Sequence, residues 1–90
     1  MSILRIHIDT LEKTHKVKEI GIFGSYAQGN QKKDSDIDII VDFHEIPSLL
    51  NFVNLQRFLQ QILLIKVDLV RKGALRKELK EGILEEATYL

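Results

Sequence analysis

The sequence predicts a small α/β (α+β) domain in which helices cover a three-stranded mixed sheet. Short, β-branched apolar runs have the length of buried strands, and longer stretches between them repeat apolar residues every three or four positions. Ninety residues leave room for one core, so we expect a single domain over residues 1–90. The predicted order is helix, strand, helix, strand, helix, strand, helix.

The first part of the chain predicts a helix, a strand and a single helical turn. Across residues 2–15, Ile3, Ile6 and Leu11 with polar residues between them fit an amphipathic helix. Residues 17–23 are short and apolar, and they stop at Gly24, which is typical of a buried strand. Residues 25–28 predict one helical turn, which Gly29 ends because glycine tolerates positive φ.

The rest of the chain predicts a loop, two strands and two helices. Residues 31–35 are a polar loop, and residues 36–43 form the strongest strand pattern of the sequence. Apolar residues at three- and four-residue steps predict a helix over 48–63. A third strand follows over 65–70, and a last helix over 74–89.

Composition excludes several classes of protein. Thirteen basic side chains balance thirteen acidic ones, whereas proteins that grip a nucleic-acid backbone carry a basic surplus, so extended nucleic-acid binding is disfavoured. The absence of cysteine removes disulfides, thiolate metal sites and cysteine nucleophiles. No apolar run approaches the roughly 20 residues of a membrane span. These features predict a cytoplasmic protein with no membrane partner.

Carboxylates on two apolar strands form the first candidate site. Asp36 and Asp38 are two apart, so they project from one face of their strand and repel each other unless a cation lies between them. A pair of this kind can also be a solvated strand start, and we interpret Asp42 as a solvent-facing residue of that sort. Asp68 changes the balance because it lies inside another apolar strand, where aspartate needs a partner. Three convergent carboxylates predict a site for Mg²⁺, with Mn²⁺ as the alternative.

The Gly24-Ser25 pair is the second candidate site. It ends one strand and opens a helical turn, where glycine lets a phosphate approach the backbone and free N–H groups favour an anion. The Ser25 hydroxyl can donate to a phosphate or act as a helix cap. Taken alone, the pair is also typical of an ordinary capped turn, and the spacing of a P-loop is absent.

Read together, the segment GSYAQGNQKKDSDIDIIV resembles the signature of the DNA polymerase β-like nucleotidyltransferase superfamily: G-S, A-R-G, a short loop, then S-D-x-D and apolar residues. The size of the chain resembles the minimal nucleotidyltransferases, the MNT domains that pair with HEPN proteins as toxin–antitoxin systems. The matching residues are Gly24, Ser25, Ala27, Gly29, Ser35, Asp36, Asp38, Ile39 and Val41.

The resemblance implies a fold and a role for each site residue. The fold would be that of polymerase β-like nucleotidyltransferases. Asp36 and Asp38 would bridge two Mg²⁺ ions, Asp68 would ligate the second ion and orient or deprotonate the attacking hydroxyl, and Gly24 and Ser25 would hold the β- and γ-phosphates of ATP or another nucleoside triphosphate.

One position departs from the family pattern. Gln28 stands where the A-R-G motif has arginine, and glutamine cannot offer the cationic fork that arginine presents to phosphates. Lys32, Lys33 or Arg71 could supply the missing charge.

The family implies an antitoxin that transfers AMP from ATP to a hydroxyl, with tyrosine expected, on a cognate HEPN ribonuclease. Two alternatives stay open. One is a binding module that masks its partner without catalysis, with Gln28 marking the lost activity. The other is a catalytic subunit that works with a separate substrate-binding protein. A homodimer or a hetero-oligomer is compatible with either.

Two surfaces could receive a partner. Arg71, Lys72, Arg76 and Lys77 form a basic cluster that could face an acidic partner or the triphosphate, or could simply be solvated. Apolar residues of the 48–63 helix belong to the core, and any that remain exposed would indicate a partner surface.

Overall fold

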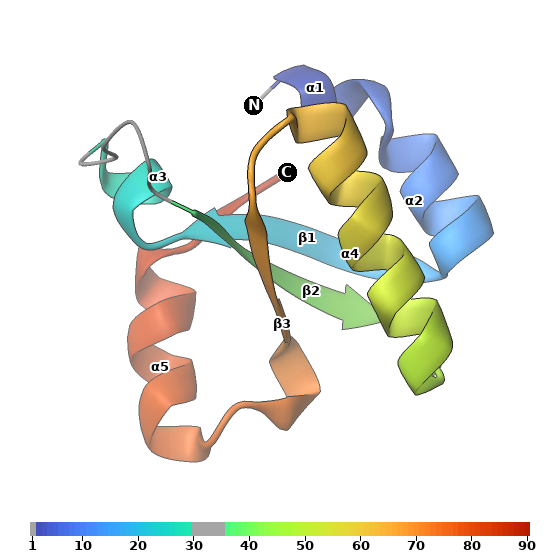
Figure 1. Ribbon diagram of the computed structural model, residues 1–90. Coiled ribbons are helices and arrows are strands. Elements are labelled where there is room, and N and C mark those ends of the chain that lie inside the picture. Colours follow the sequence, from blue (N-terminus) through green and yellow to red (C-terminus); the bar gives the residue numbers. More distant parts are fainter. Residues whose placement is uncertain (1, 30–35) are drawn as a thin grey trace.

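The computed structural model describes residues 2–29 and 36–90, and it shows a sheet with helices on both faces (Figure 1). None of the described helices is long and apolar enough to cross a membrane. The elements are α1 (Ser2–Ile6), α2 (Ile8–His15), β1 (Val17–Phe23), α3 (Ser25–Gln28), β2 (Ile37–Phe43), α4 (Leu49–Leu63), β3 (Val67–Arg71), a 3-10 helix η1 (Lys72–Ala74), α5 (Lys77–Glu86) and β4 (Thr88–Tyr89).

The sheet has four strands in the order β3-β2-β1-β4. β1 runs antiparallel to both β2 and β4, whereas β2 and β3 are parallel. A parallel pair needs a crossover connection, and α4 is that connection. Because of this topology, the C-terminal end of β1 and the N-terminal ends of β2 and β3 lie next to one another at the same end of the sheet.

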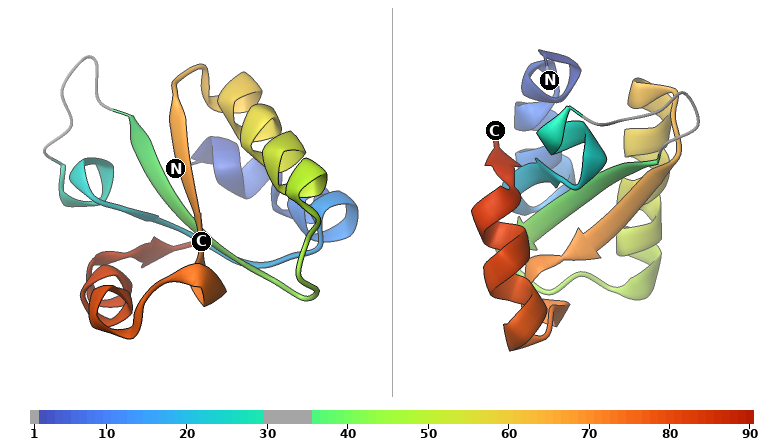
Figure 2. Two further views of the ribbon diagram at one scale, coloured as in Figure 1. Left: turned by 60° about the horizontal axis from the view of Figure 1, so that its bottom comes forward. Right: turned by 90° about the vertical axis from the view of Figure 1, so that its left-hand side faces the viewer.

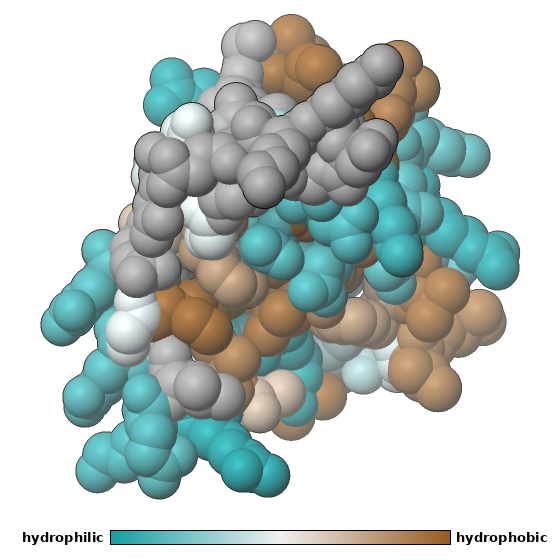
Figure 3. All heavy atoms as spheres, turned by 60° about the vertical axis from the view of Figure 1, so that its left-hand side comes forward, coloured by the Kyte–Doolittle hydropathy of each residue, from teal (hydrophilic) through white to brown (hydrophobic). Residues whose placement is uncertain are grey.

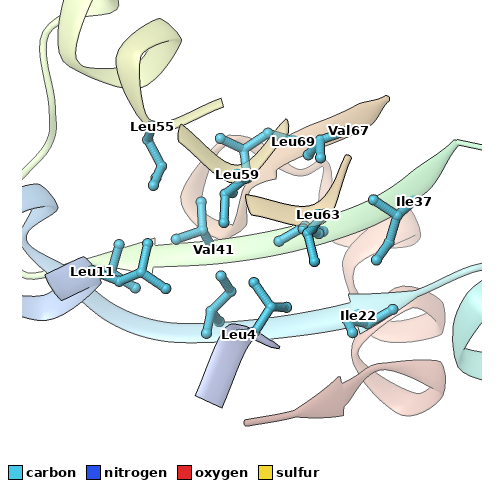
Figure 4. Packing of buried hydrophobic residues seen from close by; sticks show 13 residues of the cluster. Leu4, Leu11, Ile22, Ile37, Val41, Leu55, Leu59, Leu63, Val67 and Leu69 are labelled. Atoms are coloured by element: carbon cyan, nitrogen blue, oxygen red, sulfur yellow. The ribbon is translucent and has the colours of Figure 1, made fainter. Parts of the chain in front are cut away.

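One face of the sheet forms the main core with α1, α2 and α4. The strands alternate, so that Ile37, Ile39 and Val41 of β2 are almost completely buried on this face. Figure 4 shows Ile37 and Val41 on the same side of the sheet as the leucines of the helices. The helices contribute Leu4, Leu11, Leu55, Leu59 and Leu63.

The opposite face is covered by the C-terminal part of the chain, and α5 lies on the other side of the sheet from α4 (Figure 2). Ile40 is 1% exposed although its side chain points away from the main core. Beside it, a Cβ added at Gly21 would stand 3.1 Å from Cδ1 of Tyr89, so the tyrosine ring lies directly against this glycine. This face therefore has its own small apolar cluster, which lies where β4 pairs with β1.

Several predicted elements are confirmed. β1 and α3 have the predicted bounds, and β2 begins at Ile37, one residue after the predicted start. α4 begins at Leu49 because Ser48 is its N-cap: the Ser48 hydroxyl accepts a hydrogen bond from the Asn51 N–H at 3.1 Å. β3 starts two residues later than predicted and extends to Arg71. The predicted loop over 31–35 lies outside the described residues.

The predicted first helix is wrong as a single element. The His7 N–H bonds to the Leu4 carbonyl, three residues back, at 3.1 Å, and this tighter turn separates α1 from α2. Both helices still contribute a fully buried leucine to the same core.

The predicted last helix is wrong at both ends, and the sheet has four strands rather than three. The chain makes the 3-10 turn of η1 first, and α5 spans Lys77–Glu86. Ala87 is extended, Thr88 and Tyr89 pair with β1, and the Leu90 N–H donates to the Ile20 carbonyl at 3.0 Å. The backbone groups on the outer edge of β1 need partners, and this requirement outweighs the helical spacing of the sequence.

We predict that Leu59→Ala destabilises the protein by about 2–5 kcal/mol, because it leaves a cavity in a core position that is 0% exposed. Leu50→Ala is the matched control on the same helix: Leu50 is 69% exposed, and we expect a change within about 0.5 kcal/mol. Urea unfolding of both variants measures the difference. Equal losses would contradict the placement of the core face of α4.

Candidate active site

The candidate site lies where β1 ends and where β2 and β3 begin. Phe23 at the end of β1 pairs with Asp38, and Asp38 in turn pairs with Asp68 of β3. Residues paired across a sheet share one face, so Asp38 lies between the Gly24 turn and Asp68. α3 follows this turn directly, and Figure 3 views the molecule from the α3 side, where hydrophobic and hydrophilic side chains are exposed next to each other.

Gly24 is required by the position of Asp38. Its φ is +70°, in the left-handed region that favours glycine. A Cβ added there would collide with Oδ2 of Asp38 and would stand 3.3 Å from its Cγ. The absence of a side chain at Gly24 therefore lets the backbone of the turn approach the Asp38 carboxylate directly.

Negative charge is crowded around Asp38. Burial raises the pKa of the half-buried Asp38, and the negative charge of Asp68, a hydrogen bond with Asp68 and the charge of Asp36 raise it further. Two carboxyl groups within hydrogen-bonding distance share a proton, or they need a cation between them. The closeness of Asp38 and Asp68 is therefore compatible with two oxygen ligands for one cation.

Asp36 is less closely associated with this pair. It is exposed and lies just before β2, and it acts on Asp38 through its charge. Within residues 2–29 and 36–90, no group of three or more His, Cys, Asp or Glu side chains already has the arrangement of a metal site. The chemistry of the donors still fits a hard divalent cation, since all three candidates are carboxylates and bound positive charge would relieve their repulsion.

Ser25 and Gln28 are placed by their backbones alone. Ser25 is the first residue of α3 and follows Gly24 at the site, and Gln28 is the last residue of the same turn. Their side chains are outside what the structure describes, so the phosphate role of Ser25 and the effect of Gln28 stay predictions.

Lys72 of the predicted basic cluster pairs with Glu19 on the same face of the sheet, a partner that the sequence did not indicate. Lys72 Nζ lies 3.3 Å from Oε2 of Glu19 and 5.8 Å from the centre of the Tyr89 ring. Burial works against the charge of Lys72, but the hydrogen bond and charge of Glu19 outweigh it and raise the pKa of Lys72. Through these contacts, Lys72 links η1 to both β1 and β4. The β-forming Thr-Tyr pair after the last helix was the available signal for β4.

The mixed sheet, with Asp38 and Asp68 paired beside the Gly24 turn, agrees with the class of nucleotide-transferring enzymes that the sequence resembles. The chain belongs to the nucleotidyltransferase domain family, whose pattern matches residues 4–90. The predictions of a polymerase β-like fold and of a nucleotidyltransferase are confirmed on this evidence.

The chain is also similar to individual members of this family and to solved structures. The chain is 47% identical over 89 residues to the protein adenylyltransferase MntA of Thermococcus cleftensis, covering 99% of this chain and 90% of the relative. It superposes with a TM-score of 0.86 on a solved protein proposed to be a minimal nucleotidyltransferase, at 34% identity over 99% of this chain and 91% of the other. A toxin–antitoxin crystal structure with AMP-PNP gives a TM-score of 0.78 at 29% identity, covering 93% of this chain and 69% of that one.

We predict that Gly24→Ala destabilises the protein more than Gly29→Ala. Both glycines have positive φ, +70° and +75°, so each variant loses about 1 kcal/mol to backbone strain. Among the described residues, no atom lies within 4 Å of a Cβ at Gly29, whereas one at Gly24 displaces the Asp38 carboxylate, for about 1–2 kcal/mol more. Urea unfolding measures both. The excess should disappear in an Asp38→Ala background, and an excess that persists there would show that Asp38 is not its cause.

We also predict that Asp38→Asn stabilises the metal-free protein at neutral pH. Because the pKa of Asp38 is raised in the folded state, its ionisation costs stability, and this cost develops as pH rises from the ordinary value of 3.8 through the folded pKa. The melting temperature of the variant should therefore exceed that of the wild type at neutral pH, by no more than about 4–8 °C, and the difference should vanish in acid.

The effect of Mg²⁺ on the melting temperature, followed by circular dichroism, tests the cation site directly. Mg²⁺ should raise the melting temperature of the wild type and of Asp42→Asn, because Asp42 lies further along β2 and accepts from the Phe43 N–H at 3.0 Å. It should leave Asp38→Asn unchanged. An equal rise in Asp38→Asn would contradict a cation site at Asp38.

Proposed function

We propose that this chain is a Mg²⁺-dependent protein adenylyltransferase that moves AMP from ATP to a tyrosine hydroxyl of a HEPN ribonuclease toxin, and so acts as its antitoxin. The observation that carries the proposal is the pairing of Asp38 with Asp68 beside the Gly24 turn. The relative named protein adenylyltransferase and the toxin–antitoxin structure with AMP-PNP support the same activity and the same kind of partner.

The reaction replaces one bond to phosphorus by another. The acceptor oxygen bonds to the α-phosphorus of ATP, the bond from that phosphorus to the oxygen bridging to the β-phosphate breaks, and pyrophosphate leaves. Bound Mg²⁺, or Mn²⁺ in its place, would neutralise the charge that develops on the entering and leaving oxygens. Asp36 and Asp38 would hold this cation beside the triphosphate.

The remaining residues position the two substrates. Asp68 is exposed next to Asp38, where its carboxylate can orient the acceptor hydroxyl and take its proton. The glycine turn approaches the Asp38 carboxylate without a side chain between them, so a triphosphate can lie against its backbone N–H groups while its cation contacts Asp38. Substrate oxygens and carboxylate oxygens would then share the same cation.

A masking antitoxin without catalysis is the second candidate, and Gln28 is the observation that favours it. The family arginine at this position would bring a cationic fork to the phosphates, which glutamine lacks. In that case, the aspartates would be dispensable for neutralising the toxin.

Transfer can be measured with ATP labelled in its α-phosphate, Mg²⁺ and the HEPN partner. We predict that the wild type labels the partner, and that Asp38→Asn and Asp68→Asn each reduce the rate at least about 100-fold, because charge stabilisation by the cation contributes several kcal/mol. Asp42→Asn is the matched control on the same strand and should stay within about twofold.

Two outcomes would decide against catalysis. An unlabelled partner with the wild type, or equal labelling by Asp38→Asn, would exclude the transfer reaction. If Asp38→Asn also blocked the toxin's ribonuclease activity as fully as the wild type, the masking function would replace it.

A further inference from the structure

The free edge of β3 has a closed part and an open part. β3 has β2 as its neighbour, and among the described residues no strand lies on its other side. The Ile37 N–H donates to the Lys66 carbonyl at 3.0 Å, so alternate residues of β3, namely Val67, Leu69 and Arg71, turn their backbone groups outward.

Helix α4 closes the outer edge at Val67. The Val67 N–H donates to Oε1 of Gln60 at 3.1 Å, and its carbonyl accepts from Nε2 of Gln56 at 2.9 Å. These two glutamine side chains take the place of a neighbouring strand. Leu69 and Arg71 lie beyond the reach of these two bonds, so the edge that could accept another strand begins at Leu69.

An apolar groove lies beside this open part. Its volume is about 440 Å³. Two large apolar residues of its lining are strongly exposed: Ile46 by 81% and Leu49 by 80%. The groove is lined by Ile46, Pro47, Ser48, Leu49, Phe52, Leu69, Val70, Arg71 and Ala74.

One residue of the groove lining, Val70, lies close to the candidate active site along β3. Val70 lines the groove and lies two positions after Asp68 on the same strand, so both side chains project from the same face, roughly 7 Å apart. A chain paired with Leu69 and Arg71 would pass close to Asp68, where the proposed reaction needs its acceptor hydroxyl.

We propose that the open edge of β3 and this groove bind an extended segment of the acceptor protein as an added strand. The inference rests on the proposed function for the identity of that protein. Backbone hydrogen bonds to Leu69 and Arg71 would hold the segment, and its alternate apolar side chains would fill the groove. Arg71 is the charged residue among the described residues of the lining, so the segment carries an acidic residue at that end.

A second copy of this chain that paired symmetrically about Leu69 would fit the edge less well. In an antiparallel β3–β3 pair centred on Leu69, Arg71 of one copy would lie opposite Val67 of the other. The outer groups of Val67 are already bonded to Gln56 and Gln60, so this symmetric pairing would have to break those bonds. The acceptor segment needs only the open stretch.

Two pairs of variants test the proposal in the transfer assay. Leu49→Asp places a charge in the groove. Leu64→Asp places one on the C-cap residue at the other end of α4, where Leu64 is 86% exposed. Arg71→Pro removes the outward N–H at a φ of −84°, which lies close to the proline range, whereas Arg71→Ala removes the charge and keeps the N–H. We expect Leu49→Asp and Arg71→Pro to raise the KM for the acceptor protein at least about tenfold, with unchanged ATP affinity. Leu64→Asp should match the wild type, and Arg71→Ala should fall between the two.

Hydrogen exchange gives an independent readout of the edge. Acceptor binding should protect the amides of Leu69 and Arg71, whereas that of Val67 is bonded already. Unchanged KM values in Leu49→Asp and Arg71→Pro, or protection elsewhere on the chain, would overturn the proposal. Protection that rises with the concentration of this chain alone would assign the edge to a second copy instead.

The two proposals can fail separately. A wild type that transfers no AMP refutes the proposed activity, and the docking surface is then judged by acceptor binding and by exchange at Leu69 and Arg71. A wild type that labels the acceptor while the groove variants behave normally refutes the docking surface alone.

Discussion

The parallel pairing of β2 with β3 sets Asp38 directly opposite Asp68, and the rest of the structure is arranged around this contact. Like charges on neighbouring strands oppose the pairing that brings them together. Burial raises the pKa of Asp38 most, and the charge of Asp68 adds to the rise. In the proposed function, a bound cation would relieve this repulsion, so a geometry that is unfavourable for the bare fold would favour a metal–triphosphate complex. Gly24 completes the arrangement by leaving the Asp38 carboxylate open to the turn.

One face of the sheet forms the main hydrophobic core, and the other carries the carboxylates of the candidate site. Ile37 and Ile39 are fully buried in the main core, and Asp38 between them points to the other face. That face changes character along its length: carboxylates at the start of β2 and β3, then Ile40 and Gly21 under the Tyr89 ring, and then the Lys72–Glu19 pair. The C-terminal segment thus covers the apolar middle of this face and leaves the carboxylate end accessible.

The sequence was sufficient for the parts that depend on local pattern. The two-residue spacing of Asp36 and Asp38 predicted that they share one face of their strand, and the structure places Asp38 on the face opposite to the buried Ile37 and Ile39. The pairing of Asp38 with Asp68 was anticipated from two aspartates on apolar strands. The fourth strand was not predictable in this way, because Thr88 and Tyr89 are extended by the open edge of β1, a neighbour distant in sequence. The break at His7 likewise depends on a single hydrogen bond. The three predicted carboxylates are not placed alike: Asp38 and Asp68 pair on adjacent strands, whereas Asp36 lies just before β2.

The hydrophobic core is what keeps the site's charges together. A slip of β2 by one residue would bury Asp38 and expose Ile37, Ile39 and Val41, because strand side chains alternate between faces. Each of these side chains contributes about 1.5–3 kcal/mol by its burial. Repulsion between partly solvated carboxylates is much weaker than the sum of three such terms. The register therefore withstands the repulsion without a bound cation, and the core holds the carboxylates in a fixed arrangement. A site built this way needs no folding step on binding, which leaves the binding energy available to orient the phosphate and the acceptor.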